Sequence, residues 1–145
     1  MSFIYAYPRP AVTVDIIVIN TTKQLHEILL IERKHPPFEK SWALPGGFVN
    51  AHENLIDAAY RELLEETNIA EIKLKQFYTF GDKGRDPRGH AVSVVYYGFI
   101  TNNLTHAVAG DDAASLKWLN INDLPPLAFD HLKIITQFVA QNFNI

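Results

Sequence analysis

The chain has 145 residues, of which 48% are hydrophobic, so it is long enough for a single domain with a substantial core. Its net charge of −3 argues against general affinity for nucleic acid or membrane surfaces, and the absence of cysteine excludes disulfides, thiolate nucleophiles and cysteine-based zinc sites. Neither a targeting segment nor a stretch of transmembrane length is present, so we expect one cytoplasmic domain over residues 1–145.

The first third of the chain predicts a β-hairpin followed by a short strand. Val12–Ile19 is β-branched and apolar, which is typical of a central strand, and Leu25–Ile31 completes the hairpin after a polar turn. A loop stiffened by two prolines, Arg33–Phe38, precedes a short strand at Trp42–Leu44. Pro45–Gly47 then signals a turn.

A helix is predicted over Leu55–Thr67, because this stretch has good helix formers and neither proline nor glycine. Asn54 is placed to cap its N-terminus, with Asp57 as a short acidic partner. At about 100° per residue, an apolar face adjoins an edge of the helix that carries three carboxylates. These are Glu62, Glu65 and Glu66, and Arg61 is spaced to pair with Glu65.

The rest of the chain predicts three more strands and a final helix. The strands are expected at Glu71–Phe80, His90–Thr101 and Leu116–Leu119, separated by a polar loop at residues 81–89 and a second loop at 108–114. Asp130 is placed to cap a helix over Leu132–Asn142. This is an α+β pattern, and two helices so far apart in sequence suggest a mixed sheet with a helix on each side.

Three carboxylates on one helix edge repel one another, and a hard cation such as Mg²⁺ would relieve that repulsion. The alternative is a solvated acidic stripe held by an ion pair. The surrounding residues favour the first reading. Gly47, Glu53 and the string Arg61-Glu62-Leu63-x-Glu65-Glu66-x-Asn68-Ile69 resemble the Nudix hydrolase signature, G-x5-E-x7-R-E-U-x-E-E-x-G-U, in which U is a bulky aliphatic residue. Only Asn68 departs from it, and asparagine is the best substitute for a glycine that ends a helix in the left-handed conformation.

The resemblance implies a Nudix-type α/β/α sandwich, with a mixed β-sheet between helices, over nearly the whole chain. It implies hydrolysis of a nucleoside diphosphate derivative by water, assisted by Mg²⁺ or Mn²⁺. The implied metal ligands are Glu62, Glu65, Glu66 and the carbonyl group of Gly46, while Glu53 orients a water or a ligand and Arg61 holds Glu65.

The general base is left open by the resemblance. It is either a glutamate of the signature or an acid on a distant loop. The best distant candidates are Asp111 and Asp112, whose alternative is a polar turn, and Asp82 and Asp86 are weaker.

Substrate contacts must come from outside the signature. The candidate phosphate partners are Arg33, Arg85 and Arg88, although loop arginines are usually only solvated. The aromatic residues that could stack on a base or close the pocket are Phe38, Trp42 and Phe129, with Trp42 also suited to the core. His90 and His131 occupy ordinary places at the start of a strand and of a helix.

Four stretches, at residues 33–38, 42–49, 81–93 and 124–131, are similar to the ADP-ribose pyrophosphatase branch of the family. They are also similar to the Nudix domains of NAD-metabolism regulators, which carry a C-terminal winged-helix DNA reader. Because the chain leaves no room for that reader, we expect hydrolysis of ADP-ribose to AMP and ribose 5-phosphate, without a nucleic-acid or membrane partner. The resemblance also allows a homodimer, since proteins of the family are often dimeric.

Two alternatives to ADP-ribose hydrolysis stay open at this point. One is another nucleotide substrate, such as a dinucleoside polyphosphate, NADH or an oxidised nucleotide. The other is a non-catalytic sensor that binds ADP-ribose, against which the full glutamate set of the signature argues.

Overall fold

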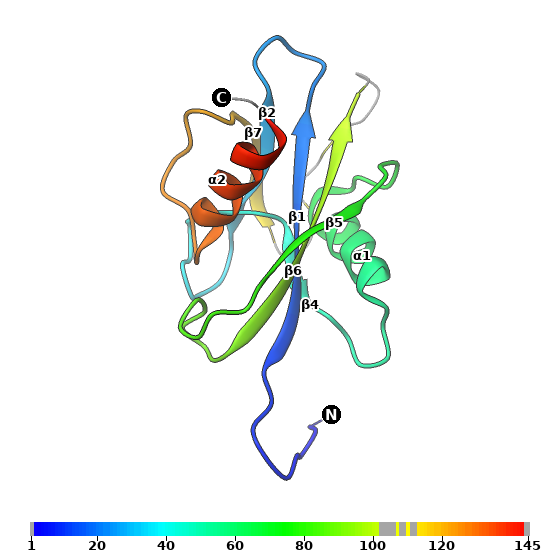
Figure 1. The fold of residues 1–145 in the computed structure, drawn as a ribbon, viewed down its shortest axis with the longest axis vertical. Helices are drawn as coiled ribbons and strands as arrows, with labels where there is room; N and C mark the ends of the chain where they lie inside the picture. The colour runs from blue at the N-terminus through cyan, green and yellow to red at the C-terminus, as the bar shows by residue number, and fades with distance from the viewer. Residues whose placement is uncertain (1, 102–106, 108–109, 111–112, 144–145) are drawn as a thin grey trace.

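The structure is a computed structural model that describes residues 2–101, 107, 110 and 113–143. Within this part of the chain, a seven-stranded mixed sheet lies between two helices (Figure 1). The strands are β1 (Ala11–Asn20), β2 (Glu27–Arg33), β3 (Trp42–Ala43), β4 (Gly46–Phe48), β5 (Lys75–Phe80), β6 (Ala91–Ile100) and β7 (Ala113–Asn120), and the helices are α1 (Leu55–Thr67) and α2 (His131–Asn142). The predicted α/β/α sandwich is confirmed, and neither described helix is long and apolar enough to cross a bilayer.

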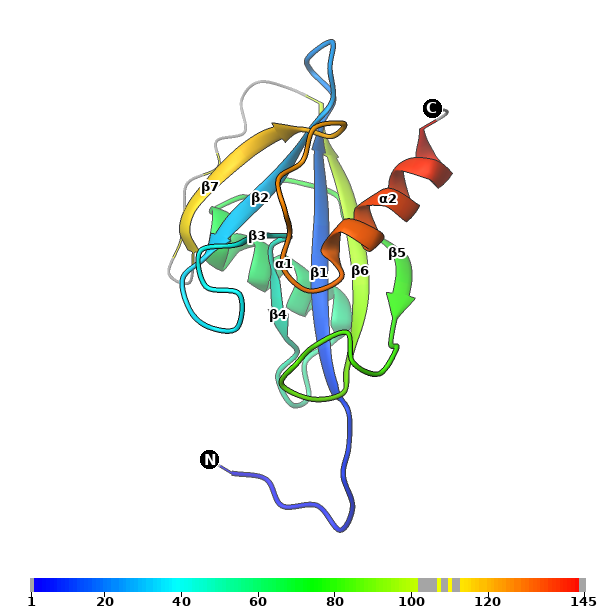
Figure 2. The same ribbon diagram turned by 90° about the vertical axis from the view of Figure 1, so that its left-hand side faces the viewer.

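Strand β1 is central, as predicted, in the order β3-β2-β1-β6-β5 (Figure 2). It runs parallel to β6 along its whole length, from the pair Ala11–Ala91 to the pair Asn20–Ile100. On its other side it changes partner. Its end forms the predicted hairpin with β2, whereas Thr13–Asp15 pairs with β4. The two strands beside β1 therefore diverge from one another near Asp15.

The turn predicted at Pro45–Gly47 is wrong, because Gly46 and Gly47 belong to strand β4. A Cβ atom on Gly46 would overlap with the carbonyl oxygen of Val14 and the carboxylate of Asp15. The absence of a side chain therefore lets β4 approach β1 closely, and the glycines mark that approach and not a reversal.

Two strands begin more than two residues away from the predicted start. Strand β5 begins at Lys75 and not at Glu71, since the N–H of Leu74 donates to the hydroxyl group of Tyr60 on α1. Strand β7 is longer than predicted, because it pairs with β2 from Arg33–Ala113 to Glu27–Asn120.

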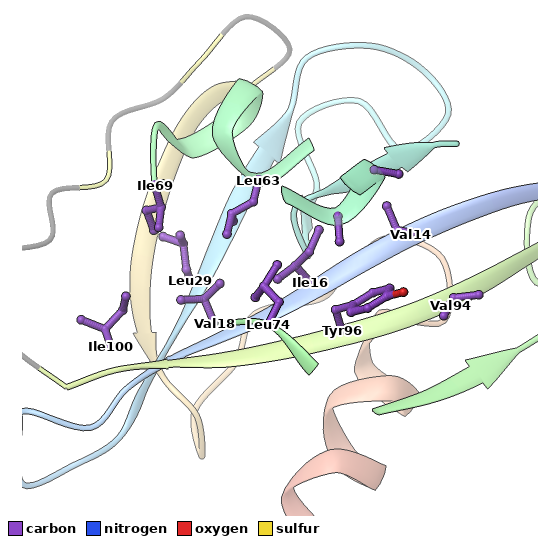
Figure 3. Close-up of a cluster of buried hydrophobic side chains, with 12 residues drawn as sticks. Val14, Ile16, Val18, Leu29, Leu63, Ile69, Leu74, Val94, Tyr96 and Ile100 are labelled. Carbon is purple, nitrogen blue, oxygen red and sulfur yellow. The ribbon is translucent and has the colours of Figure 1, made fainter. Parts of the chain in front are cut away.

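The side chains of β1 alternate between two cores, one under each helix. Val14, Ile16 and Val18 pack with Leu63 of α1 (Figure 3). Ile17 and Ile19 pack with α2 through residues that include Ile134, Ile135 and Phe138. The same alternation places Asp15 on the face that α2 covers.

Both ends of α1 bear on the sequence predictions. Asn68 has φ 62° and its N–H donates to the carbonyl oxygen of Leu64, which confirms the left-handed helix end. Asn54 precedes the helix, but its side chain contacts Asp57 at 3.3 Å and makes no capping hydrogen bond.

Replacing Asn68 by glycine is expected to shift the free energy of unfolding by less than about 1 kcal/mol, because glycine relieves backbone strain but gains entropy in the unfolded chain. Catalytic activity is expected to stay unchanged. Asn68→Ala is the control, and urea unfolding should show that it costs about 1 kcal/mol, since alanine tolerates the left-handed region poorly. A large change of activity in Asn68→Gly would assign Asn68 a role in the site.

Candidate active site

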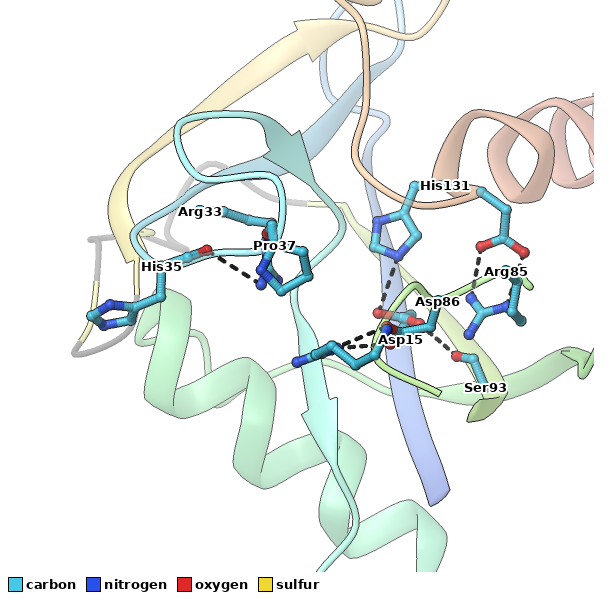
Figure 4. Close-up of polar contacts among 10 residues, drawn as sticks. Asp15, Arg33, His35, Pro37, Arg85, Asp86, Ser93 and His131 are labelled. Atoms are coloured by element: carbon cyan, nitrogen blue, oxygen red, sulfur yellow. Dashed lines mark hydrogen bonds and ion pairs between the residues drawn. The ribbon is translucent and has the colours of Figure 1, made fainter. Parts of the chain in front are cut away.

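A cavity of about 410 Å³ opens where β1, β2 and β4 diverge. Segments far apart in sequence form its wall, as Figure 4 shows for the residues around Asp15. The polar and aromatic lining residues are Thr13, Asp15, Arg33, Lys34, His35, Phe48, Asn50, Glu62, Glu66, Arg85, Asp86, Arg88, Phe129 and His131, with Gly46 and Gly47 between them.

The helix edge reaches this cavity through Glu62 and Glu66, which lie four residues apart on the same side of α1. Both are largely buried, at 8% and 5% exposed. A Cβ atom on Gly47 would lie 2.5 Å from the Glu62 carboxylate, and the Gly46 N–H lies 3.4 Å from Glu66 Oε2. The two glycines therefore let strand β4 lie directly against the carboxylates.

Arg61 connects the other acids of the signature. Its guanidinium donates to both carboxylate oxygens of Glu53, at 2.7 and 2.9 Å, and to the Phe48 carbonyl oxygen. It also contacts Glu62 at 2.8 Å and Glu65 at 3.3 Å, which confirms the predicted pairing with Glu65. Hydrogen bonds to these carboxylates raise the pKa of Arg61, and Glu53 has the largest effect. Arg61 thus holds the loop before α1 against the helix edge.

Hydrogen bonds from Arg61 and from the Asn50 N–H lower the pKa of Glu53 from 4.5 to about 2. Between these values the unfolded chain binds more protons than the folded one, so stability is full above pH 4.5 and is lost as the pH falls towards 2. We expect Glu53→Gln to flatten this part of the pH–stability curve, as measured by urea unfolding between pH 3 and 7. Glu71→Gln, at an exposed position, is the control, and a curve of wild-type slope in Glu53→Gln would contradict the assignment.

Arg33 and Arg88 form a cationic wall around the ring of Phe129. Their guanidinium carbons lie 4.8 and 5.5 Å from the centre of that ring, and Arg88 also lies 5.0 Å from the centre of Phe48. Arg88 is fixed by two hydrogen bonds to the carboxylate of Asp86. Burial and the neighbouring charge of Arg88 lower the pKa of Arg33. The proximity of two cations makes this wall suited to an anion.

Arg85 lines the cavity but is occupied by a bidentate ion pair. It donates to both carboxylate oxygens of Asp130, at 2.9 and 2.7 Å, and its side chain is 6% exposed. Burial lowers the pKa of Arg85, but the bonds to Asp130 outweigh this effect and raise it overall. The predicted capping of α2 by Asp130 is wrong, because its carboxylate binds Arg85 and makes no capping hydrogen bond.

The predicted aromatic residues lie in three different places. Phe129 lines the cavity, and Phe38 packs on it edge-to-face, with 4.9 Å between the ring centres. Both have positive φ, at 53° and 59°, which is rare for bulky side chains and marks a locally constrained site. Trp42 lies outside the cavity lining, packs against the core under α2 and has Lys117 over its ring.

Two buried polar residues in the wall were missed or dismissed at the level of sequence. Asp15 accepts a hydrogen bond from the Ser93 hydroxyl and lies 3.6 Å from Nε2 of His131 (Figure 4). Nδ1 of His131 accepts the N–H of Leu44. His131 begins α2 as predicted, but its ring lines the cavity and binds Leu44, so the interpretation that its position is an ordinary one is wrong. A charged residue within the apolar strand Val12–Ile19 was the signal that could have drawn attention to Asp15.

A model of the NUDIX domain matches residues 9–138 of this chain. The chain belongs to the Nudix family. Its similarity to the ADP-ribose pyrophosphatase of Methanocaldococcus jannaschii is 41% identity over 133 residues, which cover 92% of this chain and 75% of that enzyme. The chain is thus a Nudix hydrolase, as the signature predicted, and the helix that carries the signature, α1, lies beside the cavity.

Two further Nudix relatives are named for ADP-ribose. The ADPR responsive transcriptional repressor NtrR of Acinetobacter baylyi is 36% identical over 95% of this chain, but this chain spans only 56% of the length of the repressor. The solved NUDIX domain of Shewanella oneidensis NrtR, complexed with ADP ribose, superposes with a TM-score of 0.85 at 31% identity, covering 94% of this chain and 90% of that one.

Nudix hydrolases generally use divalent metal ions. Among the residues that the structure describes, no three histidine, aspartate or glutamate side chains are grouped so as to hold a metal ion. However, Mg²⁺ typically takes one or two protein carboxylates and completes its shell with water and substrate phosphate. The buried pair Glu62 and Glu66, beside Gly46 in the same wall, fits that requirement. The Glu65 side chain is 44% exposed and contacts Arg61 outside the lining.

The distant acids predicted as general base differ in their positions. Asp112, together with Asp111, lies outside the described residues, so its role stays a prediction. Gly110, two residues before Asp112, donates its N–H to the carbonyl oxygen of Glu66 at 2.8 Å. Asp86 lines the cavity but is bound to Arg88, which lowers its pKa against the opposing effect of burial. Asp82 is exposed and lies 3.6 Å from Lys133.

Proposed function

We propose that this Nudix hydrolase cleaves the pyrophosphate bond of ADP-ribose, giving AMP and ribose 5-phosphate, with Mg²⁺ or Mn²⁺ as the cofactor. The observation that carries the proposal is that one cavity has an acidic wall and a cationic wall. The acidic wall contains Glu62 and Glu66, and the cationic wall contains Arg33 and Arg88 around Phe129. An anion that bridges metal ions and guanidinium groups, and carries a flat ring, suits both walls.

The roles of the chain's residues follow from their positions. Glu62, Glu66 and Gly46 would hold the divalent ion, and Glu65 is proposed as a further ligand. A bound ion would neutralise charge on the pyrophosphate and lower the pKa of a water molecule. Arg33 and Arg88 donate charge-assisted hydrogen bonds to phosphate oxygens.

The reaction itself needs a water molecule and a base. The water oxygen forms a bond to one phosphorus, the bond from that phosphorus to the bridging oxygen breaks, and the water proton passes to a carboxylate. We propose Asp112 as that carboxylate, because the N–H of Gly110, two residues before it in sequence, donates to the carbonyl oxygen of Glu66 near the end of α1.

The remaining substrate assignments follow the geometry. Arg85 is paired with Asp130 and its side chain is 6% exposed, against 43% for Arg88, so we propose that it shapes the wall and contacts substrate less directly. Phe129 is proposed to stack on a ring of the substrate, with Phe38 supporting it from behind. Trp42 lies outside the lining of the cavity, so we assign it no contact with the substrate.

The substrate proposal is tested by a panel of nucleotides with Mg²⁺. The panel contains ADP-ribose, a dinucleoside polyphosphate, NADH and an oxidised nucleotide. ADP-ribose is expected to give the highest kcat/KM and to yield AMP, detected by chromatography of the products. Turnover of another member at least tenfold faster than ADP-ribose would reject the substrate while leaving the metal site intact.

The relative NtrR motivates a second candidate, an ADP-ribose sensor without turnover. A sensor would bind ADP-ribose in calorimetry but release no AMP with Mg²⁺ or Mn²⁺. The arrangement of Arg61 with the signature glutamates favours the enzyme, because a binding protein does not require this set of carboxylates. Cytoplasmic location, a homodimer and the absence of a nucleic-acid partner stay predictions.

A further inference from the structure

We propose that His131, whose Nε2 faces the carboxylate of Asp15, is a positioning residue for the backbone of residues 44–46, and thereby for the part of the cavity wall that contains Gly46. The expected effect on metal binding rests on the proposed function, in which Gly46 is a metal ligand. The positioning of residues 44–46 by His131 does not depend on that function.

Hydrogen bonds with His131, Ala128 and strand β1 hold the chain from Trp42 to Pro45. The Leu44 N–H donates to Nδ1 of His131 at 3.0 Å, and the Trp42 carbonyl oxygen accepts the N–H of Ala128 at 2.8 Å. On the other side, the Pro45 carbonyl oxygen accepts the N–H of Ile16 at 2.8 Å. The segment is thus fixed between the start of α2 and strand β1, and since Leu44 is 2% exposed, an unpaired N–H there would be costly.

The imidazole of His131 is held in one state. Because Nδ1 accepts a hydrogen bond, the ring proton lies on Nε2, which faces Asp15 Oδ1 at 3.6 Å. His131 and Asp15 are 3% and 7% exposed, and Asp15 is itself fixed by the Ser93 hydroxyl. The bond from Leu44 requires an unprotonated Nδ1, and burial, which lowers the pKa of His131 against the opposing effect of Asp15, agrees with this neutral form.

Asp15 also contacts the same segment directly. Its carboxylate occupies the space where a side chain on Gly46 would lie, so Asp15 and Gly46 pack without a gap. His131 therefore acts on this segment at Leu44, and Asp15 acts on it at Gly46. A histidine that only filled space in the core would need neither the acceptor at Nδ1 nor the carboxylate behind Nε2.

Three variants separate the two nitrogen atoms of the ring. His131→Asn places an amide oxygen close to the position of Nδ1, His131→Gln reaches the position of Nε2, and His131→Leu removes both groups. Phe138→Leu is the control, because Phe138 is fully buried on the same helix and in the same core cluster as Leu44, but its side chain has no group that can accept the Leu44 N–H. The readouts are the Kd for Mn²⁺ without nucleotide, and the NMR signals and hydrogen exchange of the Leu44 and Gly46 amides without metal.

His131→Gln and His131→Leu are expected to weaken Mn²⁺ binding by about 10-fold or more, to shift the Gly46 amide signal and to speed exchange at Leu44. His131→Asn is expected to stay within about threefold of wild type, since an acceptor for Leu44 remains. Phe138→Leu is expected to lose stability without a change in the Kd for Mn²⁺.

Unchanged Leu44 and Gly46 amides in His131→Gln and His131→Leu would overturn the proposal, and so would an equal loss of Mn²⁺ affinity in Phe138→Leu. A wild-type chain that binds no Mn²⁺ would reject the proposed function, while the amide signals would still decide the positioning. If the His131 variants do not fold, Asp15→Asn decides it: movement of the Leu44 amide supports the proposal and its absence overturns it.

Discussion

Replacing Glu66 by glutamine is expected to lower kcat by about 100-fold or more while the protein stays folded. Glutamine keeps the shape of the side chain and removes its charge. Glu66 is 5% exposed in the cavity wall, where the carboxylate of a metal ligand is worth several kcal/mol in transition-state stabilisation. Steady-state kinetics with ADP-ribose and Mg²⁺ give kcat, and thermal unfolding followed by circular dichroism checks the fold.

The neighbouring glutamates sharpen this test. Glu62→Gln should also be severe, because Glu62 lines the cavity, whereas Glu65→Gln should cost less, since the Glu65 side chain is 44% exposed and paired with Arg61. Glu71→Gln makes the same chemical change at an exposed position and should leave kcat unchanged. Near-normal turnover in correctly folded Glu62→Gln, Glu65→Gln and Glu66→Gln alike would contradict the assignment of a metal site to α1.

Replacing Arg88 by alanine is expected to raise KM for ADP-ribose by about 10–100-fold, because a charge-assisted hydrogen bond to phosphate is worth about 1.5–3 kcal/mol. The Arg88 side chain is 43% exposed and is oriented by Asp86 and by the rings of Phe48 and Phe129. Since the guanidinium is already fixed before substrate binds, little side-chain entropy is lost on binding. The effect should therefore appear in KM more than in kcat.

Arg9→Ala is the matched control for this experiment. Arg9 is exposed and also lies over aromatic rings, those of Tyr5 and Tyr7, but it is outside the cavity lining. Arg85→Ala should act mainly on stability, because the Arg85 side chain is 6% exposed and its loss would leave the Asp130 carboxylate without its bidentate partner, whereas the Arg88 side chain is 43% exposed. An unchanged KM in both Arg88→Ala and Arg33→Ala would contradict the cationic wall.

The sequence by itself determined the parts of the site that lie within one element. The spacing of Glu62 and Glu66 places both on one helix edge because the α-helix fixes the angle between residues four apart. Asn68 ends that helix through a backbone preference that is equally local. The apolar run of β1 likewise predicted a central strand, because burial on both faces favours apolar side chains at nearly every position.

Only the tertiary structure decided what meets across the cavity. Asp15 and His131 are brought together by the packing of α2 on β1, and Arg88 meets Phe129 although β6 and β7 lie between them in sequence. Gly46 and Gly47, which predicted a turn, instead allow β4 to approach its neighbours closely. The carboxylate of Asp130, which was predicted to cap α2, binds Arg85. Local periodicity specifies which face of an element is buried, but the partner found there depends on how separate elements pack.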